Sequence, residues 1–174
     1  MFAEFAQQTA AFVRDHQAWA VPIVALFAFC ESLAVLSLLV PATIILVGIG
    51  ALIGTAGLEF WPIWAGAVVG AVLGDWLSFA VGRHFGERVM TVWPLSLYPD
   101  LVPRGRAFFQ KYGAPGVFIG RFFGPLRASV PLAAGVCGMA QAPFQLANVT
   151  SAIVWAALML SPGALGGQWL QGLF

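Results

Sequence analysis

The chain has 174 residues, of which 60% are hydrophobic and 9% are charged, and its mean hydropathy is +0.89. Soluble domains carry about 25% charged residues, so this composition excludes an ordinary soluble domain and predicts an integral membrane protein. The formal net charge of +1 indicates no particular partner. No basic run or stacking platform indicates nucleic-acid binding, and no motif implies a cofactor.

We predict an N-terminal amphipathic segment over residues 1–17, lying at the membrane surface. Its weak apolar pattern is surrounded by Glu4, Arg14 and Asp15, without the basic start and cleavage site of a signal peptide. A membrane domain is expected over residues 18–167, followed by a C-terminal tail over residues 168–174. Its uncharged stretches are as long as the ~20 apolar residues that a spanning helix needs.

Two hydrophobic halves, residues 18–82 and 113–167, flank a polar centre over residues 83–112. The centre holds five of the eight basic residues, namely Arg83, Arg88, Arg104, Arg106 and Lys111. We interpret this stretch as a loop, with Pro99 and Pro103 as helix punctuation. The positive-inside rule places it in the cytoplasm.

In the first half, Val21–Ile53 is too long for one span and is interrupted at Pro41. The residues alone do not decide between two spans and a re-entrant hairpin for this segment. Trp61–Val81 is a cleaner span. Small residues recur in it at every fourth position, which predicts a ridge against which another backbone packs closely. The ridge consists of Gly66, Gly70, Gly74, Ser78 and Gly82.

The second half repeats this plan. Gly113–Ala140 is broken by Pro115, Pro125 and Pro131, and Ala142–Leu160 is then a clear span. Glu31 precedes Pro41 by ten residues, and Arg121 precedes Pro131 by ten. This matched spacing favours an internal repeat of the inverted kind found in transporters.

Four charged residues lie in apolar surroundings, namely Glu31, Asp75, Arg121 and Arg127. Each costs about 2.5–3.5 kcal/mol at a helix centre, so these residues must pair, reach water or lie near an interface. For Glu31 and Asp75 two readings stay open. Each carboxylate forms a structural ion pair with an arginine, or it is a protonatable carrier group.

Arg121 and Arg127 are six residues apart, with Gly124-Pro125 between them. A helix break there can turn both guanidinium groups toward one pocket and expose backbone N–H groups, which together make an anion site. The alternative is that both arginines extend to the cytoplasmic surface.

Residues typical of an enzyme are missing. His16 and His84 have no partner at metal-ligand or general-base spacing, and no nucleophile elbow, zinc motif or P-loop occurs. We therefore expect neither an enzyme nor a metal site. Cys30 and Cys137 are expected to be small buried hydrophobic residues.

The stretch Lys111–Phe144 resembles the signature of the DedA family, also called the VTT or SNARE-associated domain family. The matching features are Tyr112-Gly113, the pattern R-F-x-x-P-x-R from Arg121 to Arg127, Pro131, Ala134-Gly135, Met139 and Phe144. Gly70–Gly86 is similar to a second hallmark, G-x-x-x-G-D followed by G-R-x-x-G. Cys30–Pro41 is similar to the family's first hairpin with its glutamate.

This resemblance implies an all-α membrane protein with two facing re-entrant hairpins, each followed by a transmembrane helix. It implies a multi-pass protein of the bacterial plasma (inner) membrane and functional roles for Glu31, Arg121 and Arg127. Many members carry an acid after the first hairpin break, where this chain has Thr43. Asp75 is the candidate for that second acid. The chain ends early relative to longer members, so we expect a further C-terminal span to be missing.

Taken with the resemblance, the residues predict a flippase that moves a phosphate-bearing lipid between leaflets, driven by the proton motive force. Undecaprenyl phosphate is the favoured substrate. Arg121 and Arg127 would bind the phosphate, while Glu31 and Asp75 would balance charge and carry protons. The alternatives are a phospholipid scramblase or flippase, a proton-coupled small-ion antiporter, and a non-catalytic membrane assembly factor. A homo-oligomer is left open.

Overall fold

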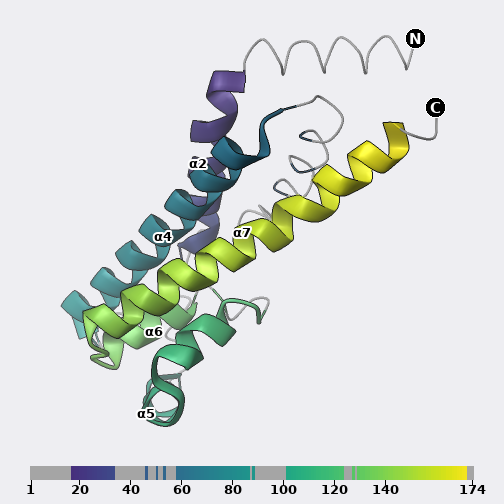
Figure 1. Cartoon of the computed structure of the whole chain (residues 1–174). Coiled ribbons are helices and arrows are strands. Elements are labelled where there is room, and N and C mark those ends of the chain that lie inside the picture. Colours follow the sequence, from purple (N-terminus) through teal and green to yellow (C-terminus); the bar gives the residue numbers. More distant parts are fainter. Residues whose placement is uncertain are drawn as a thin grey trace.

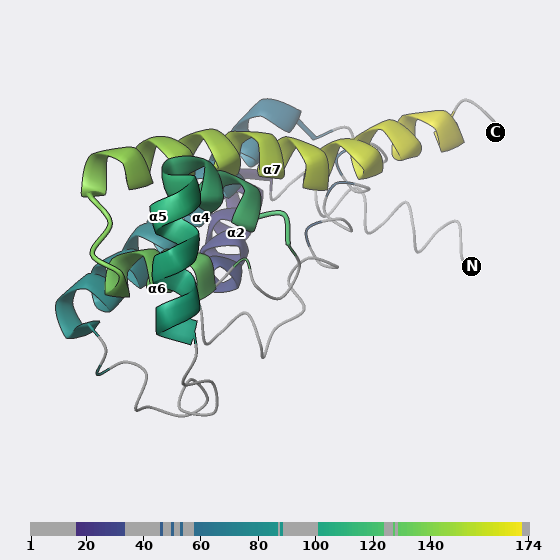
Figure 2. The same cartoon turned by 90° about the horizontal axis from the view of Figure 1, so that it is seen from below.

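The computed structural model describes residues 17–33, 46, 50, 53, 58–86, 88, 101–123, 127 and 129–171. This part of the chain contains helices and no strand (Figures 1 and 2). The helices are α2 (Gln17–Ser32), α4 (Phe60–Phe85), α5 (Leu101–Gly120), α6 (Ser129–Val136) and α7 (Gln141–Gln171). The all-α prediction is confirmed for these residues. The amphipathic segment 1–16, the break at Pro41 and Thr43 lie outside them.

Two of these helices are long and apolar enough to cross a membrane, Phe60–Phe85 and Gln141–Pro162. Both spans were predicted, and both are longer than predicted. At 1.5 Å per residue α4 is roughly 39 Å long, against a hydrocarbon core of about 30 Å. The helix α7 continues to Gln171, into the stretch expected to be a C-terminal tail.

The glycine ridge of α4 packs against α2. A Cβ atom added at Gly74 would lie 2.6 Å from the Phe29 carbonyl oxygen, and one at Gly66 would lie 2.9 Å from the Val21 carbonyl oxygen. The facing pairs are Val21 with Gly66, Ala25 with Gly70 and Phe29 with Gly74. From one pair to the next, the residue number rises by four in both helices, so α2 and α4 run parallel.

Near the C-terminal end of α4, the glycine ridge also packs against α6. A side chain at Gly82 would overlap the backbone of α6 at Leu132. From α6, Gly135 in turn lies against the α4 backbone at Phe79 and Arg83. The small residues of α4 thus allow one helix to contact two others at backbone distance.

The polar centre is less of a loop than predicted. At one end α4 continues to Phe85, and at the other α5 begins at Leu101. Pro103 does not end α5 because it lies in the first turn, where its missing N–H leaves no hydrogen bond unmade. The helix α5 bends at Gly113, whose φ of 53° suits glycine.

Pro131 also starts a helix rather than interrupting one. It is buried in the first turn of α6, which begins at Ser129. The break in the second half lies before it, in the turn that includes Arg121–Phe123 and Arg127. Pro125 falls within that stretch, outside the described residues.

Two apolar clusters stabilise the helix packing. The first joins α2, α4 and α7, and its buried members include Ala28, Ala71 and Trp155. The second joins α4 to α5, α6 and α7, where Phe79 and Phe144 stack with their ring centroids 4.0 Å apart. The buried Asp75 lies between the two clusters along α4.

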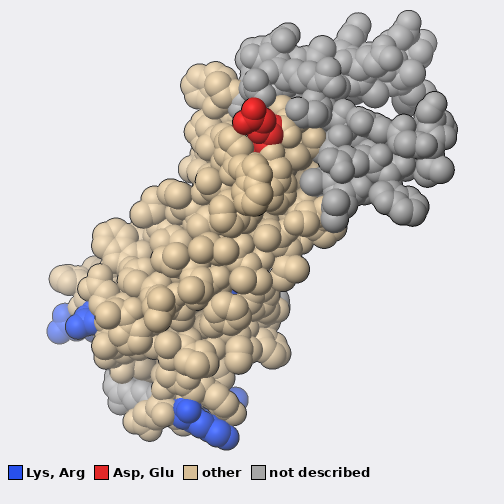
Figure 3. All heavy atoms as spheres, in the orientation of Figure 1, with Lys and Arg blue, Asp and Glu red and all other residues tan. Residues whose placement is uncertain are grey.

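The charged side chains on the surface lie at opposite ends of the molecule (Figure 3). Arg83 is in the last turn of α4, and Arg104 is in the first turn of α5. Glu59 precedes α4 at its other end and is exposed. This polarity agrees with the positive-inside rule, and the cytoplasmic location of the basic end stays a prediction.

Candidate functional site

The four charged residues singled out in the sequence come together in the interior. Glu31 is near the C-terminal end of α2 and Asp75 is in the second half of α4, while Arg121 follows α5 and Arg127 precedes α6. Their side chains are 5%, 7%, 4% and 12% exposed, respectively. Buried charges of this kind need partners, and the structure provides one for each.

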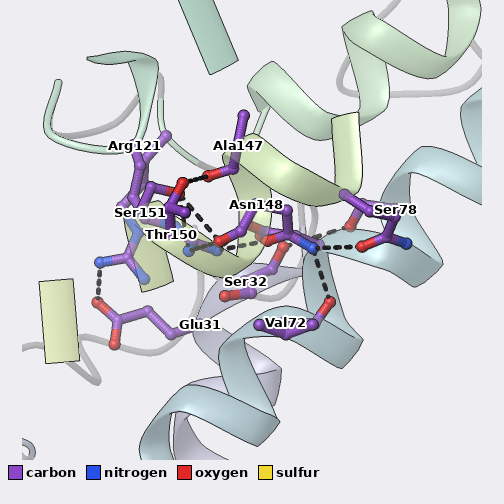
Figure 4. Close-up of polar contacts among 12 residues, drawn as sticks. Glu31, Ser32, Val72, Ser78, Arg121, Ala147, Asn148, Thr150 and Ser151 are labelled. Atoms are coloured by element: carbon purple, nitrogen blue, oxygen red, sulfur yellow. Dashed lines mark hydrogen bonds and ion pairs between the residues drawn. The ribbon is translucent and has the colours of Figure 1, made fainter. Parts of the chain in front are cut away.

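Arg121 is bound by acceptors from two helices (Figure 4). Its Nη2 forms an ion pair with Asp75 Oδ2 and donates to Asn148 Oδ1 at 3.2 Å. Its Nη1 donates to the Asn148 carbonyl oxygen at 3.0 Å and to Ser151 Oγ at 3.1 Å. Both terminal nitrogens are therefore engaged, and the guanidinium group is fixed between α4 and α7.

Asn148 holds this arrangement in place. It is buried on α7, and its Nδ2 donates to the Val72 carbonyl oxygen of α4 at 3.1 Å and to Gln145 Oε1 at 3.3 Å. The carbonyl oxygen and Oδ1 of Asn148 both accept hydrogen bonds from Arg121. The amide orientation is thus set by α4, and Asn148 positions the guanidinium relative to Asp75.

Arg127 has a different environment. Its Nη1 lies 2.9 Å from Glu31 Oε1, and its guanidinium carbon is 4.4 Å from the centroid of the Trp155 ring. The aromatic face attracts the cation without accepting an in-plane hydrogen bond. Its Nη2 is buried and has no hydrogen-bond partner among the described residues. Arg127 therefore keeps donor capacity that Arg121 has already used.

A serine pair lies beside these ion pairs. Ser78 Oγ donates to the Ser32 carbonyl oxygen at 3.3 Å, which joins the end of α2 to the ridge of α4. The Ser32 hydroxyl is buried next to Glu31 in sequence, and within the described ranges it has no hydrogen-bond partner. It is a second polar group in the interior with unused hydrogen-bonding capacity.

Each ion pair connects the two halves of the chain. Asp75 and Glu31 come from the first half, and their partners Arg121 and Arg127 come from the second. Pairing with an arginine was one of two readings for each carboxylate, and the structure adds which arginine each one contacts. Extension of Arg121 to the surface does not occur, because its side chain is buried.

Four further residues of the site were not predicted, namely Asn148, Ser151, Trp155 and Ser32. A signal for the first two existed, because an amide and a hydroxyl inside an uncharged span are typical of helix contacts in membranes. Trp155 carried none, since an aromatic residue in an apolar span is ordinary core. His84 is exposed near the basic end. Cys30 and Cys137, which were expected to be buried, are half-buried and form no disulfide with each other.

In the part of the chain that the structure describes, no group of three or more His, Cys, Asp or Glu side chains is placed to hold a metal ion. The site offers two buried guanidinium groups, each paired with a carboxylate. Chemically, that arrangement suits binding of an oxyanion such as phosphate.

Comparisons with known proteins place this chain among membrane proteins. The VTT domain model matches residues 40–165, which include Asp75, Arg121 and Arg127, while Glu31 precedes the matched range. Inner membrane protein YabI of Escherichia coli is 32% identical over 156 residues, covering 90% of this chain and 61% of that protein. Inner membrane protein YghB of the same organism is 31% identical, covering 71% of this chain and 57% of that protein.

A membrane protein of Mycobacterium tuberculosis is 35% identical over 141 residues, covering 75% of this chain and 65% of that protein. The chain thus spans about three fifths of the length of the curated relatives it matches, such as 61% of YabI. No solved structure gives a significant match.

Proposed function

Because the chain belongs to the VTT domain family, also called the DedA family, we propose that it moves a phosphate-bearing lipid between leaflets, coupled to the proton motive force. The chain is a multi-pass protein of the bacterial inner membrane. The favoured substrate is a polyisoprenyl phosphate, undecaprenyl phosphate. A phospholipid is the second candidate.

The first observation that supports the proposal is the position of two helix ends, that of α2 and that of α5. Ser32, at the end of α2, contacts Ser78, which is seven residues or roughly 10 Å before the end of α4. In the second half, the turn carrying Arg121 contacts Asn148, seven residues or roughly 10 Å into α7. Both contacts fall within the candidate membrane spans Phe60–Phe85 and Gln141–Pro162. We therefore propose that each half forms a re-entrant hairpin and that their tips meet at the two ion pairs.

The observation that carries the proposal is the pair of buried guanidinium groups, each neutralised by a carboxylate from the other half. A lipid phosphate is an anion that can replace a carboxylate as the partner of an arginine, because guanidinium binds both groups through paired N–H donors. Arg127 Nη2 and the Ser32 hydroxyl have no partner among the described residues and supply further hydrogen bonds.

Charge balance then links lipid binding to protons. The two arginines and two carboxylates of the empty site sum to zero. A phosphate monoester carries a charge of about −1.5 to −2 at pH 7, so its entry requires both carboxylates to be neutralised by protonation. Proton uptake from the acidic side releases the arginines to the phosphate. Proton loss to the other side restores the ion pairs and expels the lipid.

One observation favours a different function, a non-catalytic assembly factor with structural ion pairs. Arg121 is saturated by acceptors within the protein, as a purely structural arginine would be. In that case no lipid is bound, and the ion pairs serve only to hold the two halves together.

Reconstitution of the full chain into vesicles tests the proposal. Movement of undecaprenyl phosphate and of labelled phospholipids between leaflets is measured with and without a pH gradient. We expect gradient-dependent movement of undecaprenyl phosphate by wild type and by Lys111→Gln, an exposed cation outside the site. Arg127→Gln should abolish it. Movement that ignores the gradient indicates a scramblase, proton flux without lipid indicates an antiporter, and neither flux indicates an assembly factor.

A further inference from the structure

A large apolar groove lies between α5 and α6, outside the ion-pair site. Its volume is about 570 Å³, and among the described residues that line it Arg104 is the only charged one. Four of its lining residues are aromatic, namely Phe108, Phe109, Tyr112 and Phe123. Phe108, Tyr112 and Phe123 are 37%, 45% and 59% exposed, so the groove is open to the surroundings of the protein.

Three glycines of α5 line the groove, namely Gly105, Gly116 and Gly120. A Cβ atom added at Gly116 would lie 2.7 Å from Phe108 Cε1, and one at Gly120 would lie 2.8 Å from Val130 Cγ2. The absence of side chains there lets Phe108 and Val130 pack directly against the α5 backbone. The described lining is aromatic and aliphatic apart from Arg104 and Ser129, which suits a hydrocarbon chain.

The groove connects two chemically distinct places. One end is at Arg104 in the first turn of α5, at the basic end of the molecule. The other end includes Gly120 and Ser129, the former directly before Arg121 and the latter two residues after Arg127. It thus runs from the expected membrane surface to the turn that carries both buried arginines.

We propose that this groove binds the hydrocarbon chain of an anionic membrane lipid, with the lipid's phosphate at Arg104. In a bilayer an open apolar groove is filled by lipid tails, and the charge at its mouth selects among headgroups. Guanidinium binds a phosphate through paired N–H donors. A chain in the groove extends toward the ion-pair site, so a lipid docked here stands next to it. This binding site does not require transport.

Photocrosslinking of the full chain in phosphatidylcholine vesicles tests this. The probe is phosphatidylglycerol with a diazirine in its acyl chain, and the comparison probe is phosphatidylcholine with the same chain. Mass spectrometry locates the labelled peptides. We expect the phosphatidylglycerol probe to label α5 and α6 about tenfold more than the comparison probe, which corresponds to about 1.4 kcal/mol of headgroup selectivity.

Matched variants distinguish the groove from ordinary lipid-facing surface. Ala133→Phe fills the groove from α6 and should remove the label, whereas Ala107→Phe adds the same ring at an exposed α5 position outside it. Gly105→Leu is a second filling variant, because its added Cβ meets only Cys137 Sγ at 3.5 Å and Ala133 Cβ at 3.9 Å. Arg104→Gln should keep the label and lose the headgroup preference.

Equal labelling by both probes, or equal labelling of α4, α5 and α7, overturns the proposal. So does full labelling in both Ala133→Phe and Gly105→Leu when thermal unfolding shows that they are folded. The result is independent of transport because no gradient is applied. Groove labelling without lipid flux supports this site and contradicts the proposed function, whereas flux without groove labelling does the reverse.

Discussion

Neutralising the two carboxylates should have unequal effects on stability and transport. Asp75→Asn and Glu31→Gln keep the shape and one acceptor oxygen but remove the titratable charge. Asp75 contacts an arginine whose side chain is 4% exposed, so the uncompensated charge stays buried. Removing one partner of a buried ion pair typically costs about 3–5 kcal/mol. We expect Asp75→Asn to lose about that much.

The loss for Glu31→Gln should be smaller, about 1–2 kcal/mol, because the Trp155 ring face still attracts Arg127 and such contacts contribute roughly 0.5–2 kcal/mol. Arg127 is also more exposed, at 12%. We therefore expect Glu31→Gln to stay folded and to move lipid with a weaker response to the pH gradient, because Asp75 is then the one titratable carboxylate left among the described residues of the site. Asp75→Asn should be visibly unstable, with a melting temperature lower by roughly 10 °C.

Both measurements are made on the same purified variant, as thermal unfolding in detergent and gradient-driven lipid flux in vesicles. Glu59→Gln is the control, since it removes an exposed carboxylate that makes no side-chain cap hydrogen bond at α4. Normal stability of Asp75→Asn would refute the buried Arg121–Asp75 ion pair. Flux in Glu31→Gln with the same gradient dependence as wild type would refute Glu31 as a proton carrier.

Three further predictions concern the arginines, the ridge and the topology. Arg121→Lys and Arg127→Lys should each reduce lipid flux at least about tenfold although charge is kept, because Lys lacks the planar fork; wild-type flux in both folded variants would contradict phosphate binding through paired donors. Gly74→Leu should destabilise the protein by several kcal/mol, because a Cβ added at Gly74 already lies 2.6 Å from the Phe29 carbonyl oxygen and 2.7 Å from Ser32 Cβ. Ala65→Leu, on the exposed face of α4, should not. Equal melting temperatures of the two variants would contradict the α2–α4 packing. In a variant without Cys30 and Cys137, a cysteine at Glu59 should react with an impermeant reagent outside intact cells and one at Arg88 should not; the opposite pattern would invert the topology.

The membrane spans could be predicted because they depend on composition over about twenty residues. Trp61–Val81 and Ala142–Leu160 both lie within observed helices. The spacing of small residues likewise predicted a closely packed helix face. It carried no information on the neighbour, because any backbone can lie against glycine. That α2 occupies most of the ridge and α6 the end at Gly82 follows only from the three-dimensional arrangement.

The sequence predicts that each buried charge requires a partner, but it does not predict which residues contact each other. An unpaired charge in an apolar segment is too costly, so each of the four residues required a partner or water. The partners are far apart along the chain, with Asp75 and Arg121 separated by 46 residues. Which carboxylate meets which arginine depends on how deep α2 reaches and where the second-half turn falls. Neither depth is encoded in a local pattern.

The central segment shows the limit of reading prolines and charges as a loop. Arg104, Lys111 and Pro103 suggested an irregular stretch, yet all three lie in α5. Proline in a first turn is compatible with a helix, and exposed basic residues are compatible with one at the membrane surface. The bend at Gly113 marks the change from this polar part of α5 to the apolar part that reaches Arg121.

The two ion pairs differ in a way that bears on the number of protons that the proposed transport would move. Arg121 is fixed by Asp75, Asn148 and Ser151. Arg127 has one carboxylate, one ring face and a donor nitrogen without a hydrogen-bond partner among the described residues. The Arg127–Glu31 pair should therefore open more easily. If it alone opens, one proton and one singly charged phosphate preserve neutrality, which suits a phosphodiester lipid. A phosphate monoester needs both pairs to open, and hence two protons per lipid. Counting protons per lipid thus separates the two substrate classes, and a count of two requires that Asp75 releases Arg121 despite its other bonds.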